Sequence, residues 1–300
     1  MLKERLEDFT KILRPQFLLG SVLLFLVGSV YAGRGRVDLS AELICALMAV
    51  VLIQIFGHLA NDYFDREGDV PSHRTLFAGG SGMIQSSSFS PRSVLWMATM
   101  AGISCLLLAI LVVALTGRWL FLPLMVLGLA GGWAYSASPV RLVSTWFGEL
   151  SVALLLGIFL PLTGAYFSSG TFDPSVLVLG IPLFLFSLEC LIGVEFPDEE
   201  ADLASGKKNL TYRLGIRRSK LLHMLLLMMS YAAVMIEVVL GSMAMGALLL
   251  LVTLPLSLYS MWKLISMKGY DFSVAKTASN LGMLINGLSM AIMLVYMMLF

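Results

Sequence analysis

Charged residues are scarce in this sequence. Asp, Glu, Lys and Arg together make up 13% of the 300 residues, whereas hydrophobic residues make up 58%. A soluble domain normally has about 25% charged residues. This chain therefore has too little polar surface to cover a water-soluble fold. The composition predicts an integral membrane protein and excludes an ordinary soluble domain.

Cysteine is also scarce, with three residues, and there is no large excess of charge of one sign. The formal net charge is +1 and the basic residues are scattered, so nucleic acid is excluded as a partner. Cys45, Cys105 and Cys190 all lie inside apolar runs, at spacings that fit neither a metal site nor a disulfide framework. The N-terminus lacks the segment order of a signal peptide, and no feature indicates an obligate protein partner.

Long hydrophobic runs fill most of the chain. At about 20 residues per span, they predict an all-α protein with nine transmembrane helices around a central cavity. The expected spans are about 16–33, 39–62, 93–116, 119–136, 147–168, 175–196, 219–240, 243–263 and 276–299. Residues 2–14 predict an interfacial amphipathic helix that ends before Pro15. We expect one polytopic domain over residues 1–300.

The distribution of Lys and Arg predicts the orientation. If the N-terminus is cytoplasmic, nine spans place 17 of the 20 Lys and Arg residues on the cytoplasmic side. The other three are Arg34, Arg36 and Arg118. Such an asymmetry predicts a multi-pass protein of the cytoplasmic membrane, with its N-terminus inside and its C-terminus outside.

One stretch concentrates acidic residues at the end of the second predicted span. Asn61, Asp62, Asp65 and Asp69 would fall within an arc of roughly 100° if the helix continued through them. Three carboxylates and one carboxamide on one face are suited to Mg²⁺, which is usually held by a few carboxylates together with substrate phosphates. The pattern therefore predicts a magnesium site that binds a diphosphate.

A second acidic stretch follows the sixth predicted span. Asp198 and Asp202 are one helical turn apart within residues 195–202, and the two stretches together hold nine of the 19 acidic residues. A solvated loop is the simpler explanation for one such cluster. Both spans run toward the cytoplasm in the predicted topology, so both clusters lie at the same membrane face. A shared active site opening to the cytoplasm is the better interpretation.

The connections after these spans are expected to form a cytoplasmic cap. Residues 63–92 contain Arg74 and a Gly79–Gly82 stretch, and they predict a partly helical lid. Residues 197–218 include Lys207, whose charge could neutralise a diphosphate. A cation-coupled transporter is the rival class, but its acidic residues would be expected near the middle of the membrane.

The two motifs, Asn61-Asp62-x-x-Asp65-x-x-x-Asp69 and Asp198-x-x-x-Asp202, resemble those of the UbiA superfamily of membrane prenyltransferases. Further similarity lies in Arg14-Pro15 before the first span, Tyr135-Ser136-x-x-Pro139 after the fourth and Gly-Lys-x-x-Leu after the second motif. The closest resemblance is to the branch that prenylates 1,4-dihydroxy-2-naphthoate for menaquinone. His58-Leu59 and Glu195-Phe196-Pro197 depart from the usual residues that lead into the two motifs.

This resemblance implies a function for the candidate residues. Asp62, Asp65, Asp69, Asp198 and Asp202 would be the catalytic and Mg²⁺-binding residues. The expected substrate-binding residues are Asn61, Arg74, Tyr135, Arg141, Glu189 and Lys207. For Glu189, which lies inside a span, helix–helix hydrogen bonding is an equally good interpretation.

The implied reaction is Mg²⁺-dependent transfer of a polyprenyl group from an allylic diphosphate to an aromatic small molecule. The acceptor expected from the resemblance is 1,4-dihydroxy-2-naphthoate. Other acceptors stay open, namely 4-hydroxybenzoate, homogentisate or a glycerol-phosphate lipid, as does cyclisation of the prenyl chain. The partners are therefore a polyprenyl diphosphate, an aromatic acceptor and membrane lipid.

Overall fold

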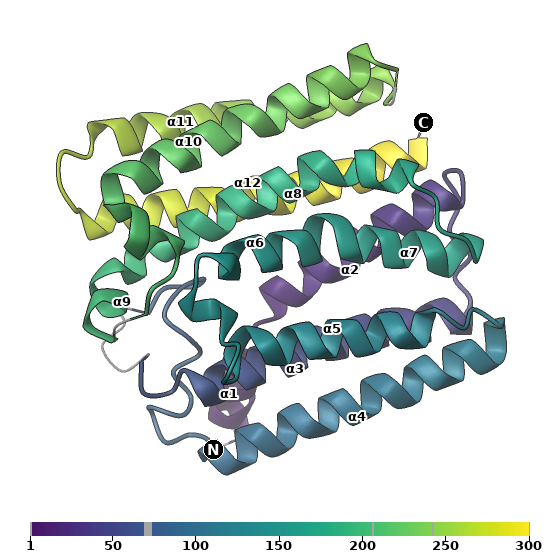
Figure 1. The fold of residues 1–300 in the computed structure, drawn as a ribbon, viewed down its shortest axis with the longest axis horizontal. Coiled ribbons are helices and arrows are strands. Elements are labelled where there is room, and N and C mark those ends of the chain that lie inside the picture. Colours follow the sequence, from purple (N-terminus) through teal and green to yellow (C-terminus); the bar gives the residue numbers. More distant parts are fainter. Residues whose placement is uncertain (1, 69–73, 206, 242, 300) are drawn as a thin grey trace.

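The computed structural model describes residues 2–68, 74–205, 207–241 and 243–299, and every regular element in these ranges is helical (Figure 1). The helices of the N-terminal half are α1 (Leu2–Leu13), α2 (Pro15–Ala32), α3 (Ala41–Phe64), α4 (Pro91–Thr116) and α5 (Phe121–Ser136). They are followed by α6 (Phe147–Leu154), α7 (Leu160–Ser169), α8 (Ser175–Glu195), α9 (Glu199–Ser205), α10 (Leu210–Val239), α11 (Leu254–Ser266) and α12 (Phe272–Leu299). A π-helical turn, Leu155–Phe159, joins α6 to α7, and a 3₁₀ helix, Met245–Thr253, precedes α11.

Eight of these helical segments are long and apolar enough to cross a membrane. They coincide with eight of the nine predicted spans, and the chain is a multi-pass membrane protein. The ninth prediction, 119–136, corresponds to α5, which is apolar but has only 16 residues. A helix of that length is shorter than the about 20 residues that a full span needs.

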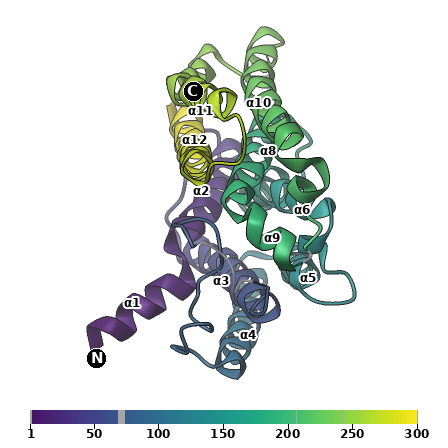
Figure 2. The same cartoon turned by 90° about the vertical axis from the view of Figure 1, so that its left-hand side faces the viewer.

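The long helices lie side by side, so their ends form two opposite edges of the molecule (Figure 1). The end of α3, the start of α6, and α9 all lie at the left edge in this view. Figure 2 looks onto that edge and shows α1 extending away from the other helices. The predicted amphipathic segment 2–14 is confirmed as a helix over Leu2–Leu13.

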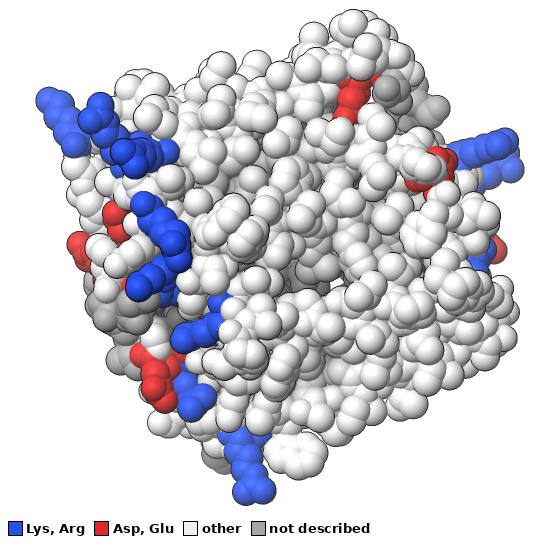
Figure 3. Space-filling view, in the orientation of Figure 1, with Lys and Arg blue, Asp and Glu red and all other residues white. Residues whose placement is uncertain are grey.

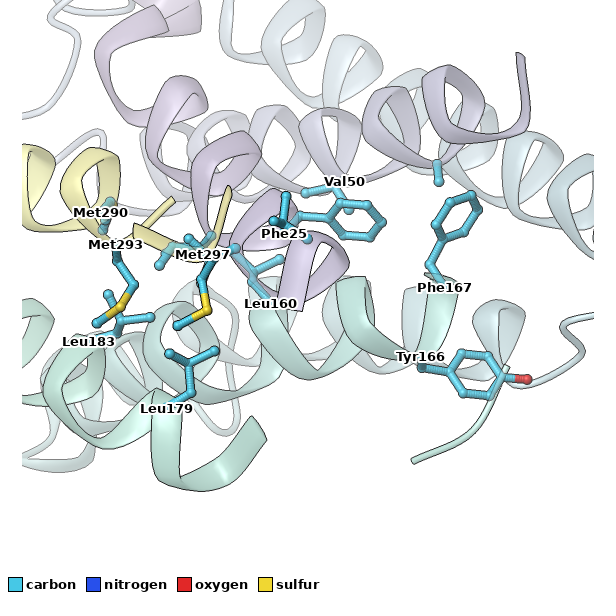
Figure 4. Close-up of a cluster of buried hydrophobic side chains, with 14 of the residues drawn as sticks. Phe25, Val50, Leu160, Tyr166, Phe167, Leu179, Leu183, Met290, Met293 and Met297 are labelled. Atoms are coloured by element: carbon cyan, nitrogen blue, oxygen red, sulfur yellow. The ribbon is translucent and has the colours of Figure 1, made fainter. Parts of the chain in front are cut away.

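The largest hydrophobic cluster joins helices that are distant in sequence. Phe25 of α2 lies near Phe167 of α7, and the α12 methionines Met293 and Met297 lie near leucines of α8 (Figure 4). Methionine is flexible and fills irregular gaps between rigid helices. The cluster lies away from the acidic motifs and holds the two halves of the chain together.

Two glycines allow α2 and α7 to touch through their backbones. A Cβ atom at Gly28 would lie 1.8 Å from the carbonyl oxygen of Pro161, and one at Gly164 would lie 1.9 Å from that of Phe25. No side chain can occupy this space, and small residues are the usual means of close helix packing in membranes. The α2–α7 contact therefore fixes the position of α2, whose first residue follows Arg14.

Candidate active site

The first motif spans the end of α3. The helix ends at Phe64, and Asp65 follows it with φ −94° and ψ 4°. The expectation of one helical face continuing through Asp69 is therefore wrong from Asp65 onward, and a turn occupies residues 66–68. Asp69 itself lies outside the described residues. Asp62 and Asp65 remain close because they flank the last turn of the helix.

Asp62 is nearly buried and binds a residue from the start of the chain. Its side chain is 4% exposed, and Oδ1 accepts a 2.6 Å hydrogen bond from Nη2 of Arg14. The backbone N–H of Ser81 donates to the same oxygen at 3.3 Å. Arg14 has a left-handed backbone (φ 50°) between α1 and α2. Asp62 is thus contacted by Arg14, which precedes α2, and by Ser81, which follows α3.

Asp65 is paired with cations from two further segments. Nη2 of Arg141 is 3.1 Å from Oδ1, and Nζ of Lys207 is 3.6 Å from Oδ2. Nδ2 of Asn61 donates to Oδ2 at 3.2 Å and lies 3.4 Å from Oγ of Ser136. Arg141 also has a left-handed backbone (φ 42°). Three residues that the sequence nominated therefore contact the carboxylate of Asp65, namely Asn61, Arg141 and Lys207.

The second motif faces the loop that follows the first. Oδ2 of Asp198 accepts a 2.9 Å hydrogen bond from the backbone N–H of Gly79, which has a φ of 87°. Such a positive φ is readily adopted by glycine alone. Oδ2 of Asp202 accepts a 2.5 Å bond from Nδ2 of Asn209. The loop of Gly79 and Ser81 therefore contacts one carboxylate from each motif.

The described part of that loop contradicts one expectation. Residues 65–68 and 74–90 contain turns and no helix, so the lid predicted as partly helical has no helical turn within them. Its glycines favour an irregular backbone instead, because Gly79, Gly80 and Gly82 all have a positive φ. The side chain of Arg74 lies against Gly82, where a Cβ atom would be 2.5 Å from its Nε.

Both motifs border one cleft. It has a volume of about 480 Å³, and its walls carry two motif carboxylates and several cations. The lining residues are Tyr63, Phe64, Asp65, Arg66, Glu67, Gly68, Arg141, Ser144, Asp202 and Lys207. Acidic residues 137 positions apart, Asp65 and Asp202, thus face the same space. Of the nominated cations, Arg141 and Lys207 line the cleft, whereas Arg74 is not among its lining residues.

The donor set fits a magnesium ion shared with a diphosphate. Oδ2 of Asp62 is buried and has no hydrogen-bond partner among the described residues. In the described ranges no three His, Cys, Asp or Glu side chains are grouped closely enough to hold a metal by themselves. Mg²⁺ usually takes one or two carboxylates plus substrate phosphates and water, so a site of separate carboxylates suits it.

A tyrosine outside the spans supports the second motif. The hydroxyl of Tyr270 donates to the carbonyl oxygen of Pro197 at 3.2 Å, directly before Asp198. Burial first, and then the nearby acids Glu200 and Glu199, raise the pKa of Tyr270 to about 12. The hydroxyl therefore remains a proton donor at neutral pH and ties the loop before α12 to the motif.

Two other nominated residues are not among those that line the cleft. Tyr135, at the end of α5, interacts electrostatically with Lys207 and Asp65 and so belongs to the site's surroundings. Glu189 is fully buried and lies 3.0 Å from Nε2 of His223 on α10. Gly282 of α12 packs against the same carboxylate. These contacts favour the helix–helix interpretation of Glu189.

The sequence alone did not single out Arg14 or Asn209 as site residues. The Arg14-Pro15 pair was noted only as a similarity. A cation just before the first span was an available signal for Arg14, but its partner Asp62 is 48 positions away.

Surface charge gathers at the same edge as the cleft. Lys and Arg side chains line the left edge of the molecule, and a smaller group lies at the right edge (Figure 3). Most of the face between the two edges is uncharged, as expected for a surface in contact with lipid. The cleft residues thus occupy the more basic end of the bundle.

Comparisons with known proteins agree with this architecture. The chain is 26% identical over 206 residues to 1,4-dihydroxy-2-naphthoate octaprenyltransferase of Bacillus subtilis (strain 168), which is 68% of this chain and 65% of that protein. The match thus spans slightly under two thirds of the Bacillus relative. The enzyme of the same name from Haemophilus influenzae is 23% identical over 235 residues, covering 76% of this chain and 75% of the relative.

Solved structures share the fold at low identity. A UbiA homolog from Archaeoglobus fulgidus bound to GPP and Mg²⁺ superposes with a TM-score of 0.70 at 18% identity, over 97% of this chain and 98% of that one. A digeranylgeranylglyceryl phosphate synthase has a TM-score of 0.67 at 17% identity, over 98% and 99%. The model of the UbiA prenyltransferase family matches residues 21–296, so this chain belongs to that family.

Proposed function

We propose that this protein transfers a polyprenyl group from an allylic diphosphate to an aromatic acceptor in a Mg²⁺-dependent reaction. The observation that supports this most directly is the shared cleft, in which Asp65 of the first motif faces Asp202 of the second beside Arg141 and Lys207. Carboxylates that bind a cation, next to side chains that bind phosphate oxygens, suit a diphosphate leaving group.

The chain's own residues would bind and orient the diphosphate. Asp62 and Asp65, with Asp69, Asp198 and Asp202, would hold Mg²⁺, which neutralises the leaving group when bound. Lys207 and Arg141 would turn from Asp65 toward phosphate oxygens, because charge-assisted hydrogen bonds to phosphate are stronger than neutral ones. Asn61 would keep Asp65 in position through its 3.2 Å bond.

For the acceptor we propose 1,4-dihydroxy-2-naphthoate, in menaquinone biosynthesis. The support is the name of the Bacillus and Haemophilus relatives, 1,4-dihydroxy-2-naphthoate octaprenyltransferase. A glycerol-phosphate lipid is the second candidate, because a fold neighbour is a digeranylgeranylglyceryl phosphate synthase. The fold neighbour that binds GPP and Mg²⁺ supports the donor and the cation rather than the acceptor.

The function can be tested with the purified full-length chain. We expect prenylated product, identified by mass spectrometry, when geranyl diphosphate, Mg²⁺ and 1,4-dihydroxy-2-naphthoate are supplied together. Excess EDTA is expected to abolish turnover, because the proposed function of the motif carboxylates is to hold the Mg²⁺ that neutralises the leaving group. Product from another acceptor alone would reassign the substrate, and full turnover in EDTA would contradict the metal mechanism.

We also propose that the cleft opens to the cytoplasm and that the N-terminus lies on that side. The basis is the Lys and Arg asymmetry, since the nine-span topology predicted from the sequence assigns 17 of the 20 to the side of the two motifs. A cysteine placed at the exposed Ser88 is expected to react with an impermeant thiol reagent only from the cytoplasmic side. The matched control is a cysteine at the exposed Ser169, at the opposite end. The reverse labelling pattern would invert the topology.

A further inference from the structure

One polar side chain lies in the middle of α3 without a partner. Gln54 is inside the apolar run of this helix, two turns before Asn61. Its side chain is partly exposed, and among the described residues its amide has no hydrogen-bond partner. A polar side chain inside a membrane helix normally pairs with a neighbouring helix, and an unpaired one is a candidate functional residue.

The face of α3 that carries Gln54 points into the bundle. The ring centroid of His58, one turn further on, is 5.5 Å from that of Phe17 on α2. On the other side of this face, a Cβ atom on Gly128 of α5 would lie 2.9 Å from Cδ1 of Ile53. Around the helix, Gln54 falls between His58 and Ile53. Its side chain therefore lies between α2 and α5 and not on the lipid-facing side.

An open space adjoins Gln54 on the same side of α3. A Cβ atom on Gly57 would meet no atom of the described residues within 4 Å, apart from its chain neighbours and the backbone of its own helix. The helical neighbours Ile53 and Ala60 are 6% and 0% exposed, so the space is inside the bundle. A Cβ atom on Gly132 of α5 would lie 3.6 Å from Cα of Gly57. The space is therefore next to the contact between α3 and α5.

Neither backbone conformation nor packing explains the glycine at position 57. Gly57 lies within α3 and does not have a positive φ. No neighbouring helix occupies its Cβ position, in contrast to Gly28 and Gly164. Glycine in a helix interior is less favourable than alanine. The missing side chain instead leaves room for a molecule that the protein binds.

The open space is also close to the cleft. Gly57 precedes Asn61 by one turn, which is about 6 Å along the helix. Nδ2 of Asn61 donates to Oδ2 of Asp65 at 3.2 Å and lies 3.4 Å from Oγ of Ser136 on α5. A molecule in this space would therefore lie on the membrane side of a diphosphate bound at Asp65.

We propose that this space binds the aromatic acceptor and that the Gln54 amide forms a hydrogen bond with one of its polar substituents. This inference rests on the proposed function and adds two specificity-determining residues, Gln54 and Gly57. An amide can both donate and accept, and 1,4-dihydroxy-2-naphthoate has hydroxyl and carboxylate groups that can pair with it. An isoprenoid chain has no such group, and it would leave the amide buried and unpaired at a cost in free energy.

The first test replaces Gln54 with Met, which has a similar length but no amide. Full-length Gln54→Met and wild type are compared with Mg²⁺, geranyl diphosphate and 1,4-dihydroxy-2-naphthoate. We expect KM for the acceptor to rise about 10-fold or more, the effect of losing a hydrogen bond to a strongly polar or charged group. KM for geranyl diphosphate should stay within about threefold, because the proposed contact is with the acceptor.

Acceptor analogues distinguish a direct contact from a general structural defect. 1,4-Dihydroxynaphthalene lacks the carboxylate, and 1-hydroxy-2-naphthoate and 4-hydroxy-2-naphthoate each lack one hydroxyl group. Their Kd values are measured by calorimetry, with Mg²⁺ and the unreactive donor analogue geranyl S-thiolodiphosphate present. Gln54→Met should weaken binding about 10-fold for compounds that keep the contacted group and less than about threefold for the one that lacks it. A structural defect would weaken all of them equally.

The second test fills the open space with Gly57→Leu. We expect Kd for 1,4-dihydroxy-2-naphthoate to rise about 10-fold or more, without a lower melting temperature, because leucine favours the helix and the space is empty. The matched control is Gly287→Leu on α12. A Cβ atom on Gly287 likewise meets no described atom within 4 Å, and its neighbours Leu284 and Leu288 are exposed. Acceptor binding by this control should match that of the wild type.

Either variant decides the matter if the other fails to fold. Unchanged acceptor binding in Gln54→Met, or an equal loss for every analogue, would overturn the inference. It would also be overturned if Gly57→Leu weakened only donor binding, more for geranyl than for dimethylallyl diphosphate, because the space would then hold the isoprenoid chain. These outcomes leave the proposed function standing. Absence of any prenylated product with the wild type would overturn both.

Discussion

Replacing Asp65 with Asn is expected to lower kcat/KM by about 10²-fold or more, which corresponds to about 2.7 kcal/mol of transition-state stabilisation. Asp65 is 3% exposed, lines the cleft and meets both Arg141 and Lys207. Asn keeps the shape of the side chain but removes the charge that would bind Mg²⁺. Steady-state kinetics with geranyl diphosphate and the naphthoate acceptor provide the measurement.

The melting temperature of the Asp65→Asn variant should fall slightly. The sequence alone suggests the opposite, because the motif holds several carboxylates that would repel one another. In the structure Asp65 is surrounded by two cations and an amide, so its loss leaves Arg141 and Lys207 without that partner. Thermal unfolding in detergent distinguishes the two expectations.

Glu200→Gln is the control for charge removal, because this acid lies on α9 near the second motif but is exposed. Its rate and melting temperature should match those of the wild type. Equal and small kinetic effects at Asp65 and Glu200 would mean that Asp65 serves only to pair with Arg141 and Lys207, and would contradict the metal-dependent mechanism.

Replacing Lys207 with Met is expected to raise KM for the allylic diphosphate about 10- to 100-fold, since a hydrogen bond to a charged group contributes about 1.5–3 kcal/mol. Nζ of Lys207 lies 3.6 Å from Oδ2 of Asp65, and the side chain lines the cleft between the motifs. Met retains the length and apolar stem of the side chain. The acceptor's KM should change far less, because the proposed contact is with phosphate.

The neighbouring residue offers a matched control. Lys208 has the same charge and is exposed, so Lys208→Met should leave both KM values unchanged. If both variants raised KM for the diphosphate equally, the effect would come from the overall positive charge of this end, not from a contact in the cleft. Binding measured at two ionic strengths separates these cases, since long-range attraction is screened by salt.

The helical membrane architecture could be predicted from the sequence because each span carries its own signal. Hydrophobic length alone predicts spans at about 39–62 and 175–196, whatever they pack against, and the structure has α3 and α8 there. Where a helix stops depends on weaker signals. The end of α3 at Phe64 was missed, because Asp65 and Arg66 have acceptable helix propensity and the turn that follows depends on tertiary contacts.

Parts of the candidate site could be predicted for a different reason. Asp62, Asp65, Asp198 and Asp202 stand out as charges at the ends of apolar runs, so composition reveals them. Arg14 gives a weaker signal, because a basic residue before a first span is ordinary. The Gly79 contact with Asp198 was equally hidden, because it uses a backbone N–H that has no residue-specific signal.

The position of Arg14 limits how the chain can be shortened. α1 extends from the bundle in Figure 2 and resembles a dispensable surface anchor. Yet Arg14, which follows α1, donates a 2.6 Å hydrogen bond to the nearly buried carboxylate of Asp62. A version beginning at Pro15 would therefore lose a counter-ion from its active site as well as a membrane contact. A version beginning at Arg14 would lose only the membrane contact of α1, so comparing the two versions would separate the loss of that contact from the loss of the counter-ion.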